Sequence, residues 1–208
     1  MHVSEAILSP PVLIAGALVA AGGTAIGLRQ MSDKDMVKVA VISSALFVAT
    51  LIKIPFVATS VHLILNGLGG ILLGWQLFPA FVIALVLQSI IFGIGGLSTL
   101  GVNAVILALP GVCCYYLFNS FARNADLNKM FPIGFAAGSM AILIGSLLLS
   151  GTLLSTGEEF TVLAGTVLVA HIPVLVVEGL VTGAALSFLR KVRPETLTLS
   201  LHLEESSS

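Results

Sequence analysis

Long apolar stretches alternate with short polar or glycine-rich segments along the chain. The apolar stretches cover residues 11–28, 37–52, 61–74, 78–92, 104–121, 131–154 and 161–189. A helix needs about 20 apolar residues to cross the hydrocarbon core of a bilayer, and most of these stretches approach or exceed that length. The pattern predicts an all-α polytopic membrane protein with seven transmembrane helices, of which the short, glycine-rich third is the weakest.

Prolines mark the start of the first helix. Pro10 and Pro11 end an extended N-terminal segment, because proline fits the first turn of a helix and not its interior. Eight extended residues reach at most about 27–29 Å, so residues 1–8 are long enough to fold back into an outward-facing cavity. We expect one transmembrane domain over residues 1–193, with 1–8 as a metal-binding segment, and a polar tail over 194–208.

Basic residues gather after the first, fifth and seventh apolar stretches: Arg29, Lys34, Lys38, Arg123, Lys129, Arg190, Lys191 and Arg193. Short cytoplasmic loops of membrane proteins carry such residues. Glu158 and Glu159 occupy a loop that falls on the opposite side, and Lys53 is the one basic residue out of place. Seven helices then put the N-terminus outside and the C-terminus in the cytoplasm, in a multi-pass protein of the cell membrane.

The composition narrows the possible functions. Only 9% of the residues are charged and 57% are hydrophobic, whereas a soluble domain has about 25% charged residues. The net charge of −1 gives no reason to expect nucleic acid as a partner. Cys113 and Cys114 are adjacent in an apolar stretch and suit packing rather than a disulfide. The chain has neither a G-x-x-x-x-G-K-[ST] phosphate loop nor an H-E-x-x-H motif, so any ATP hydrolysis by such a loop is expected on another subunit.

The first two residues, Met1 and His2, carry chemistry that the apolar stretches lack. No Lys or Arg precedes Arg29, so the opening lacks the charged start of a secretory signal, and we expect it to be retained. The α-amine, the His2 amide nitrogen and the His2 imidazole can close two fused chelate rings in one plane, which leaves one position for a second imidazole. Four nitrogens in a plane suit Ni(II) or Cu(II) better than Zn(II), Mg(II) or Ca(II). The alternative is that Met1 is only the start residue and His2 a loose terminal side chain.

The predicted third helix carries a polar stripe. His62, Asn66, Gly70 and Gly74 recur every four residues, and Gly70 and Gly74 suit a close helix crossing. His62 is the expected second imidazole, because ionisable residues inside a membrane are usually functional; its alternative is a hydrogen bond to a neighbouring carbonyl. Asn103 could orient His62 or His2 without contacting the ion, or it could cap the fifth helix.

The last stretch contains a second polar pair. His171 and Glu178 lie seven residues apart, hence on one helix face about 10 Å from each other. With Pro173 between them they could form a deeper cation site or a proton route, or a satisfied hydrogen bond between helices. In the first stretch, small residues form a ridge that fits either packing inside the bundle or docking of another membrane protein: Ala17, Ala21 and Ala25.

Several segments together resemble the CbiM/NikM family, the substrate-binding (S) components of energy-coupling-factor transporters for cobalt and nickel. They are Met1-His2 followed by Glu5, residues 59–70 (TSVHLILNGLGG), residues 95–103 (GGLSTLGVN), residues 108–111 (ALPG), and His171 to Glu178. The resemblance covers roughly residues 1–190 and implies a seven-span fold whose N-terminus tucks into the outward face. It also implies the metal ligands, namely the Met1 amine, the His2 amide and imidazole, and the imidazole of His62. We expect Asn103 and Glu5 to orient these ligands without binding the ion themselves.

The resemblance also implies a transport component rather than an enzyme. Its partners would be a transmembrane coupling subunit, ATPase subunits, a small accessory membrane protein and the lipid bilayer; the alanine ridge is a candidate for docking the coupling subunit. No cofactor is expected, because the bound ion is the substrate. The stretch around His62 is closer to the nickel branch than to the cobalt branch, which tends to a Ser-His-Pro pattern, so we expect Ni²⁺ rather than Co²⁺. Family members usually have glycine after the acidic residue of the N-terminal segment, where this chain has Ala6.

Two other functions fit some of the same residues. An intramembrane zinc enzyme could use His62, His171 and Glu178, provided that one coordination position stays open for water. A gradient-driven cation carrier could use His171 and Glu178 as its proton relay.

Overall fold

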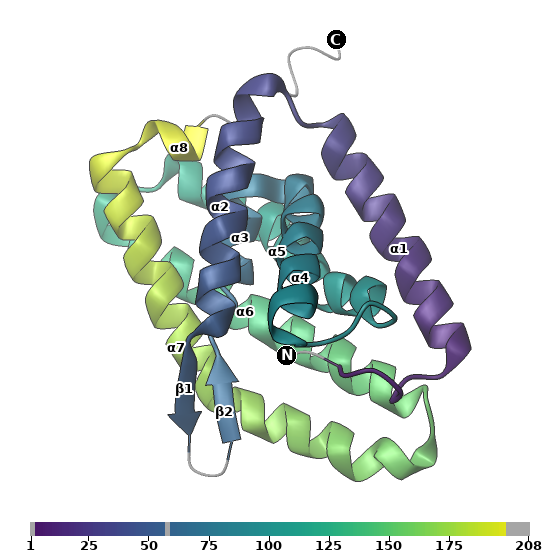
Figure 1. Cartoon of the computed structure of the whole chain (residues 1–208). Helices are drawn as coiled ribbons and strands as arrows, with labels where there is room; N and C mark the ends of the chain where they lie inside the picture. The colour runs from purple at the N-terminus through teal and green to yellow at the C-terminus, as the bar shows by residue number, and fades with distance from the viewer. Residues whose placement is uncertain (1–2, 57–58, 199–208) are drawn as a thin grey trace.

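The computed structural model describes residues 3–56 and 59–198, which form helices apart from one short hairpin (Figure 1). In chain order the elements are α1 (Pro10–Arg29), α2 (Asp33–Leu51), β1 (Lys53–Phe56), β2 (Thr59–His62), α3 (Asn66–Leu73), η1 (Gly74–Gln76), α4 (Leu77–Phe92), α5 (Leu100–Asn124), α6 (Leu127–Leu154), η2 (Glu158–Phe160), α7 (Thr161–Val192) and α8 (Glu195–Thr198). In this part of the chain, five helical stretches are long and apolar enough to cross a membrane: α1, Asn66–Phe92, α5, α6 and Glu158–Val192. A helical, polytopic membrane protein is confirmed, whereas the count of seven spans stays a prediction.

Local chemistry sets the ends of several helices. Proline occupies the first turn of α1, as the sequence predicts. At the start of α2, the Asp35 carboxylate accepts hydrogen bonds from the Ser32 amide at 3.0 Å and from the Ser32 hydroxyl at 2.7 Å. At the end of α4, Gly93 adopts the left-handed conformation (φ 64°) that glycine tolerates best. These signals are local, so the sequence places these helices nearly correctly.

The prediction of a third helix over residues 61–74 is wrong. Val61 and His62 belong to strand β2, which pairs antiparallel with β1 so that Lys53 lies opposite His62, and helix α3 begins only at Asn66. The predicted stripe therefore does not exist, since His62 lies on a strand and Gly74 follows the end of α3 with φ 54°. The physical reason is that Leu65 adopts a left-handed backbone (φ 57°), which stops a right-handed helix from running through it.

Two buried clusters show which parts of the chain meet at each end of the bundle. The smaller cluster joins the N-terminal segment to the start of α5, the end of α6 and the start of α7: Val3, Leu8, Val102, Ile106, Leu149, Leu153 and Ala164. The larger cluster includes the start of α2, the end of α5 and α8 through Val39, Ala122, Ala125 and Leu197. Figure 1 shows the turn between α1 and α2 at the same end as α8. The basic last turns of α1, α5 and α7 therefore share that end, as the loop charges predict, and its cytoplasmic orientation stays a prediction.

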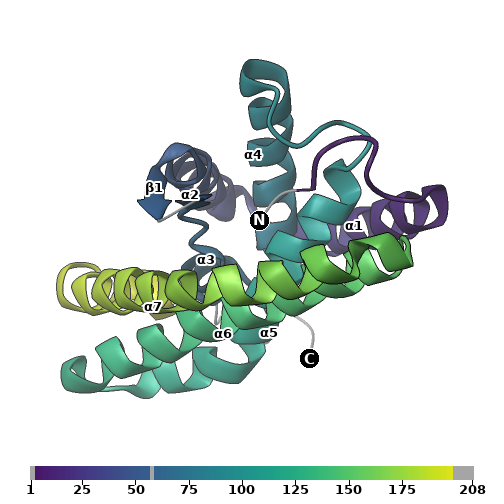
Figure 2. The same cartoon turned by 90° about the horizontal axis from the view of Figure 1, so that it is seen from below.

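Glycines allow α6 and α7 to pack closely. Figures 1 and 2 show these two helices side by side along most of their lengths. A Cβ atom added at Gly134 would lie 2.7 Å from the Cα of Gly183, and one added at Gly138 would lie 2.6 Å from the carbonyl oxygen of Glu178. Gly70 of α3 abuts the backbone of Gly111 in α5 in the same way, so the predicted close crossing is present at Gly70.

Candidate metal centre

The backbone of Val3 is fixed inside the protein by the side chain of Asn103. The Val3 amide donates to Asn103 Oδ1 at 2.9 Å, and Asn103 Nδ2 donates to the Val3 carbonyl at 3.1 Å. The hydroxyl of Thr99 donates to the same carbonyl at 3.1 Å. Val3 is 3% exposed and Asn103 is 1% exposed. Met1 and His2 lie outside the described residues, but the residue that follows them is buried and bonded through both of its backbone polar groups.

The position of Asn103 in α5 excludes one of the two roles considered for it. Helix α5 begins at Leu100, and the residue at its N-cap position is Thr99, so Asn103 already lies in the first turn. Its side chain bonds to Val3 and to the Thr99 hydroxyl, the latter at 3.2 Å. The capping role is therefore wrong, and Asn103 instead binds the N-terminal segment.

Glu5 contacts the loop that precedes α5. Its Oε1 accepts from the amide and from the hydroxyl of Ser98, both at 3.4 Å. Any side chain larger than hydrogen at Gly96 would collide with the Glu5 side chain. Glu5 thus joins the N-terminal segment to the 93–99 loop from an exposed position.

Ala6 adopts a left-handed conformation (φ 64°), which glycine tolerates better than alanine. A β-carbon makes this conformation unfavourable by about 1–2 kcal/mol. We therefore expect Ala6→Gly to stabilise the protein by about 0.5–1 kcal/mol, after allowance for the greater flexibility of glycine in the unfolded chain. The measurement is the thermal unfolding midpoint of the purified protein in detergent.

Ala15→Gly is the matched control for Ala6→Gly. Ala15 is exposed in the interior of helix α1, where glycine should lower stability by about 0.5–1 kcal/mol. If both substitutions lower the midpoint, Ala6 does not hold the strained turn.

His62 is held in a defined tautomer. It is half-buried at the end of β2, and its Nδ1 lies 2.8 Å from the carbonyl oxygen of Thr50. A carbonyl can only accept, so Nδ1 carries the proton and the lone pair of the neutral ring is on Nε2. Histidines that bind metals commonly donate one ring N–H to a carbonyl in this way, which orients the other nitrogen toward the ion. This hydrogen bond is compatible with a ligand role for His62, which the sequence had placed on a helix.

Two buried polar residues support that arrangement. Thr50, whose carbonyl accepts from His62, also accepts a hydrogen bond from Gln88 Nε2 at its hydroxyl. Thr50 is 3% exposed and Gln88 is 1% exposed. Neither residue was predicted from the sequence to have a role. Their only signal was polarity near the end of one apolar stretch and inside another.

His171 and Glu178 each bond to a different part of the protein. His171 Nδ1 lies 2.7 Å from the carbonyl oxygen of Val167 in its own helix. The Glu178 carboxyl accepts from the amides of Ile64 and Leu65, between β2 and α3. Among the residues that the structure describes, no three His, Cys, Asp or Glu side chains form a group that could hold a metal ion. The triad required for a zinc enzyme is therefore not assembled.

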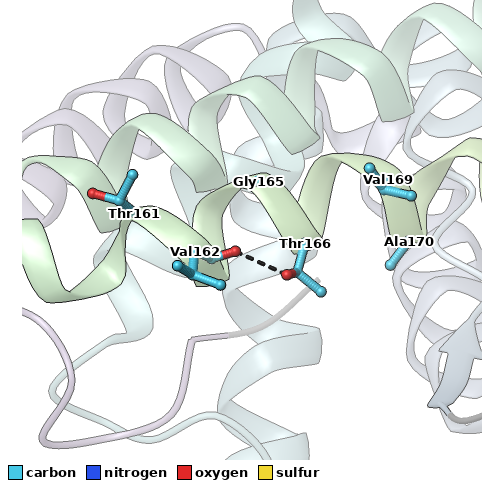
Figure 3. Close-up of a pocket in the computed structure, with 6 residues that line it drawn as sticks. All are labelled: Thr161, Val162, Gly165, Thr166, Val169 and Ala170. Atoms are coloured by element: carbon cyan, nitrogen blue, oxygen red, sulfur yellow. Dashed lines mark hydrogen bonds between the residues drawn. The ribbon is translucent and has the colours of Figure 1, made fainter.

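Helix α7 also carries an open pocket of about 490 Å³, lined by residues of this helix alone (Figure 3). The lining residues are Thr161, Val162, Gly165, Thr166, Val169 and Ala170. The hydroxyl of Thr166 is already bonded to the Val162 carbonyl at 2.8 Å. None of the six side chains offers a nitrogen or a carboxylate to a cation, so this pocket is not a candidate for the metal.

The alanine ridge of α1 is exposed. The side of α1 that packs inside the bundle consists of other small residues: Gly16, Ala20, Gly23 and Gly27. Of these, Gly23 lies against the ring of Phe78 and Gly27 against the backbone of Trp75. Ala17, Ala21 and Ala25 are exposed. The backbone of Ala17 also packs against Gly101 of α5, so it is Ala21 and Ala25 that packing inside the bundle does not explain.

Comparisons with known proteins agree with this architecture. Residues 2–196 match the CbiM family model, described as the cobalt uptake substrate-specific transmembrane region. A "Putative metal transport protein" of Haemophilus influenzae is 40% identical over 95% of this chain and 97% of its own length. A "Putative fused cobalt transport protein CbiMQ" of Methanocorpusculum labreanum is 26% identical over 94% of this chain and 36% of its own length.

A solved structure shares the fold. The crystal structure of a truncated transition metal transporter superposes with a TM-score of 0.71 at 21% identity, covering 92% of this chain and 99% of the other. The family match extends over nearly the whole chain, including the segment that binds Asn103 and the strand that carries His62. The chain belongs to the CbiM family of metal uptake proteins.

Proposed function

We propose that this protein is the substrate-binding component of an ATP-driven ECF-type transporter and captures Ni²⁺ at the outer face of the cell membrane. The ion is held in a plane by four nitrogens: the Met1 amine, the His2 amide, the His2 imidazole and the His62 imidazole. The two-way pairing of Asn103 with the Val3 backbone carries this proposal, because it fixes the chain one residue after His2. Because consecutive Cα atoms are about 3.8 Å apart, we expect His2 to bind the ion close to that buried point.

Burial of Val3 supports a terminus that is folded inward. A loose terminus would leave the backbone of Val3 to water, whereas here both of its polar groups bond to α5 or to the residue before it. Fixing a terminal segment costs conformational entropy, and ligation of a metal by Met1 and His2 would offset that cost.

The hydrogen bond of His62 supports its imidazole as the fourth nitrogen ligand. Its Nδ1 proton is bound by Thr50, and the lone pair on Nε2 is the only one that the neutral ring can offer to a metal. The same four nitrogens also bind Co²⁺, more weakly in the Irving–Williams order. Nickel is proposed from the planar donor set and from the sequence around His62; transport of Co²⁺, the ion in the family's description, is the alternative.

The family and the exposed surface of α1 support the proposed partners. The fused CbiMQ relative supports a second transmembrane protein as the coupling subunit of this chain. The exposed ridge of Ala17, Ala21 and Ala25 is its proposed docking surface, because small residues let a second helix approach closely. ATPase subunits and a small accessory membrane protein complete the proposed assembly. Uptake by this chain alone into proteoliposomes would instead favour the gradient-driven carrier.

The affinity for nickel is expected to depend on pH, because the ligands must be free of protons to bind. The amine, the amide and both imidazoles must lose a proton or stay neutral to bind, and ordinary imidazoles and α-amines titrate near pH 6.5 and 7.7–8.0 respectively. The affinity measured by equilibrium dialysis should therefore fall as the pH falls, most steeply below about pH 6. Co²⁺ measured in parallel should bind more weakly at each pH. An affinity that stays flat from about pH 8 to about pH 5 would contradict the amine–imidazole site.

A further inference from the structure

Glu178 is a buried acid whose contacts lie beside the proposed metal ligand. Its side chain is 0% exposed in the middle of α7. Its Oε1 accepts from the Ile64 and Leu65 amides, and its Oε2 accepts from the Leu65 amide at 3.0 Å. Both oxygens are thus occupied by backbone N–H groups two and three residues after His62.

These hydrogen bonds hold a turn that would otherwise be unfavourable. Leu65 has a left-handed backbone (φ 57°), which a branched apolar residue rarely adopts without support. The turn separates strand β2 from helix α3, so its shape fixes the direction in which the chain passes His62. Because both oxygens of Glu178 bond to its amides, α7 defines the position of this turn.

His62 is consequently held from two sides. On one side its Nδ1 is bonded to the Thr50 carbonyl at the end of α2. On the other, the chain that follows it is bonded to Glu178 in α7. Helix α7 is itself pressed against α6, since the backbone of Glu178 packs on Gly138. Movement of α7 relative to α2 would therefore move the imidazole relative to the N-terminal segment.

We propose that Glu178 is the positioning residue of the metal site: it holds residues 64–65 so that the His62 imidazole completes the four-nitrogen plane. This assignment rests on the proposed function. Glu178 does not bind the ion itself, because its oxygens are engaged by the Ile64 and Leu65 amides. The competing explanation is that Glu178 only stabilises the packing of α3 against α7.

A double-mutant cycle separates the two explanations. Nickel dissociation constants are measured by equilibrium dialysis for the full-length protein, Glu178→Gln, His62→Ala and the double variant, together with the ligand-field absorption of bound Ni(II). We expect Glu178→Gln to weaken nickel binding by about 10-fold or more, within the 10–100-fold range known for residues that orient metal ligands. In the His62→Ala background the same substitution should change affinity less than about twofold, because sites that act through one group are not additive.

Thr182→Val is the matched control. Thr182 lies one turn further along α7, is equally buried, and its hydroxyl has no hydrogen-bond partner among the described residues, so nickel affinity should not change. Glu178→Gln should also shift the nickel absorption toward that of His62→Ala, a change that looser packing alone would not produce. Should Glu178→Gln fail to fold, Glu178→Asp, which withdraws the carboxyl by one methylene, is used in the same cycle.

The outcomes distinguish this assignment from the proposed function. Glu178→Gln could lower nickel affinity equally in the parent protein and in His62→Ala, or in neither of them. Either result overturns the positioning role of Glu178 and leaves the proposed nickel site intact. Equal nickel affinity of the parent protein and His62→Ala overturns the four-nitrogen site, and the role of Glu178 with it.

Discussion

Adding two residues, Gly-Ser, in front of Met1 should weaken nickel binding by more than about 100-fold, beyond the range for residues that only orient a ligand. The extension converts the proposed amine ligand into a peptide amide and moves the new amine away from His2, which breaks the first chelate ring. It leaves every original side chain in place. The dissociation constant of the purified protein, measured by equilibrium dialysis against Ni²⁺, tests this directly.

The same two residues added after Ser208 provide the control, because the chemical change is identical and the proposed site is untouched. This protein should bind nickel as the parent does. If the N-terminal extension binds nickel as tightly as the C-terminal one, the α-amine is not a ligand and the site must be built from other groups.

His62→Ala should weaken nickel binding by about 100-fold or more, because it removes one of the four proposed nitrogens rather than a group that supports one. The absorption of bound Ni(II) should also change, since water or another oxygen would replace an imidazole in the plane. Titration of the variant with nickel, followed by its visible spectrum, measures both effects in one experiment.

His171→Ala is the comparison for His62→Ala. His171 is another half-buried histidine of the membrane domain, bonded to the Val167 carbonyl much as His62 is bonded to Thr50. We expect no loss of nickel affinity for this variant, because His171 is not one of the proposed ligands. A loss with His171→Ala and none with His62→Ala would move the metal to the deeper site on α7.

Most of the fold follows from local patterns. Apolar length placed α1, α4, α5, α6 and α7 within a few residues of their observed bounds, because a membrane helix satisfies its own backbone and needs few distant partners. The segment from Lys53 to Asn66 is different. Its left-handed Leu65 is bonded to Glu178, which lies 113 residues away along the chain. No periodicity within residues 61–74 could have indicated that contact.

For the candidate site, the sequence indicated the polar residues but not the residues to which they bond. Chelate chemistry singled out Met1 and His2, and polarity in an apolar context singled out His62, Asn103 and Glu178. The partners of these residues were not predictable: Thr50 for His62, Val3 for Asn103 and Ile64 for Glu178. In each pair one partner contributes only its backbone, so its side chain gives the sequence no signal. Ala6 is the exception, since the glycine that the family resemblance leads us to expect there would suit its positive φ of 64°.

The most direct test of the central claim is the coordination of Ni(II) bound to the purified full-length protein, measured by X-ray absorption at the nickel edge. Nickel held by the chain terminus and His62 should show four nitrogen neighbours and the edge feature of a square-planar ion, and the Gly-Ser extension before Met1 should abolish that signature. Six oxygen and nitrogen neighbours around nickel, unchanged by the extension, would contradict the account.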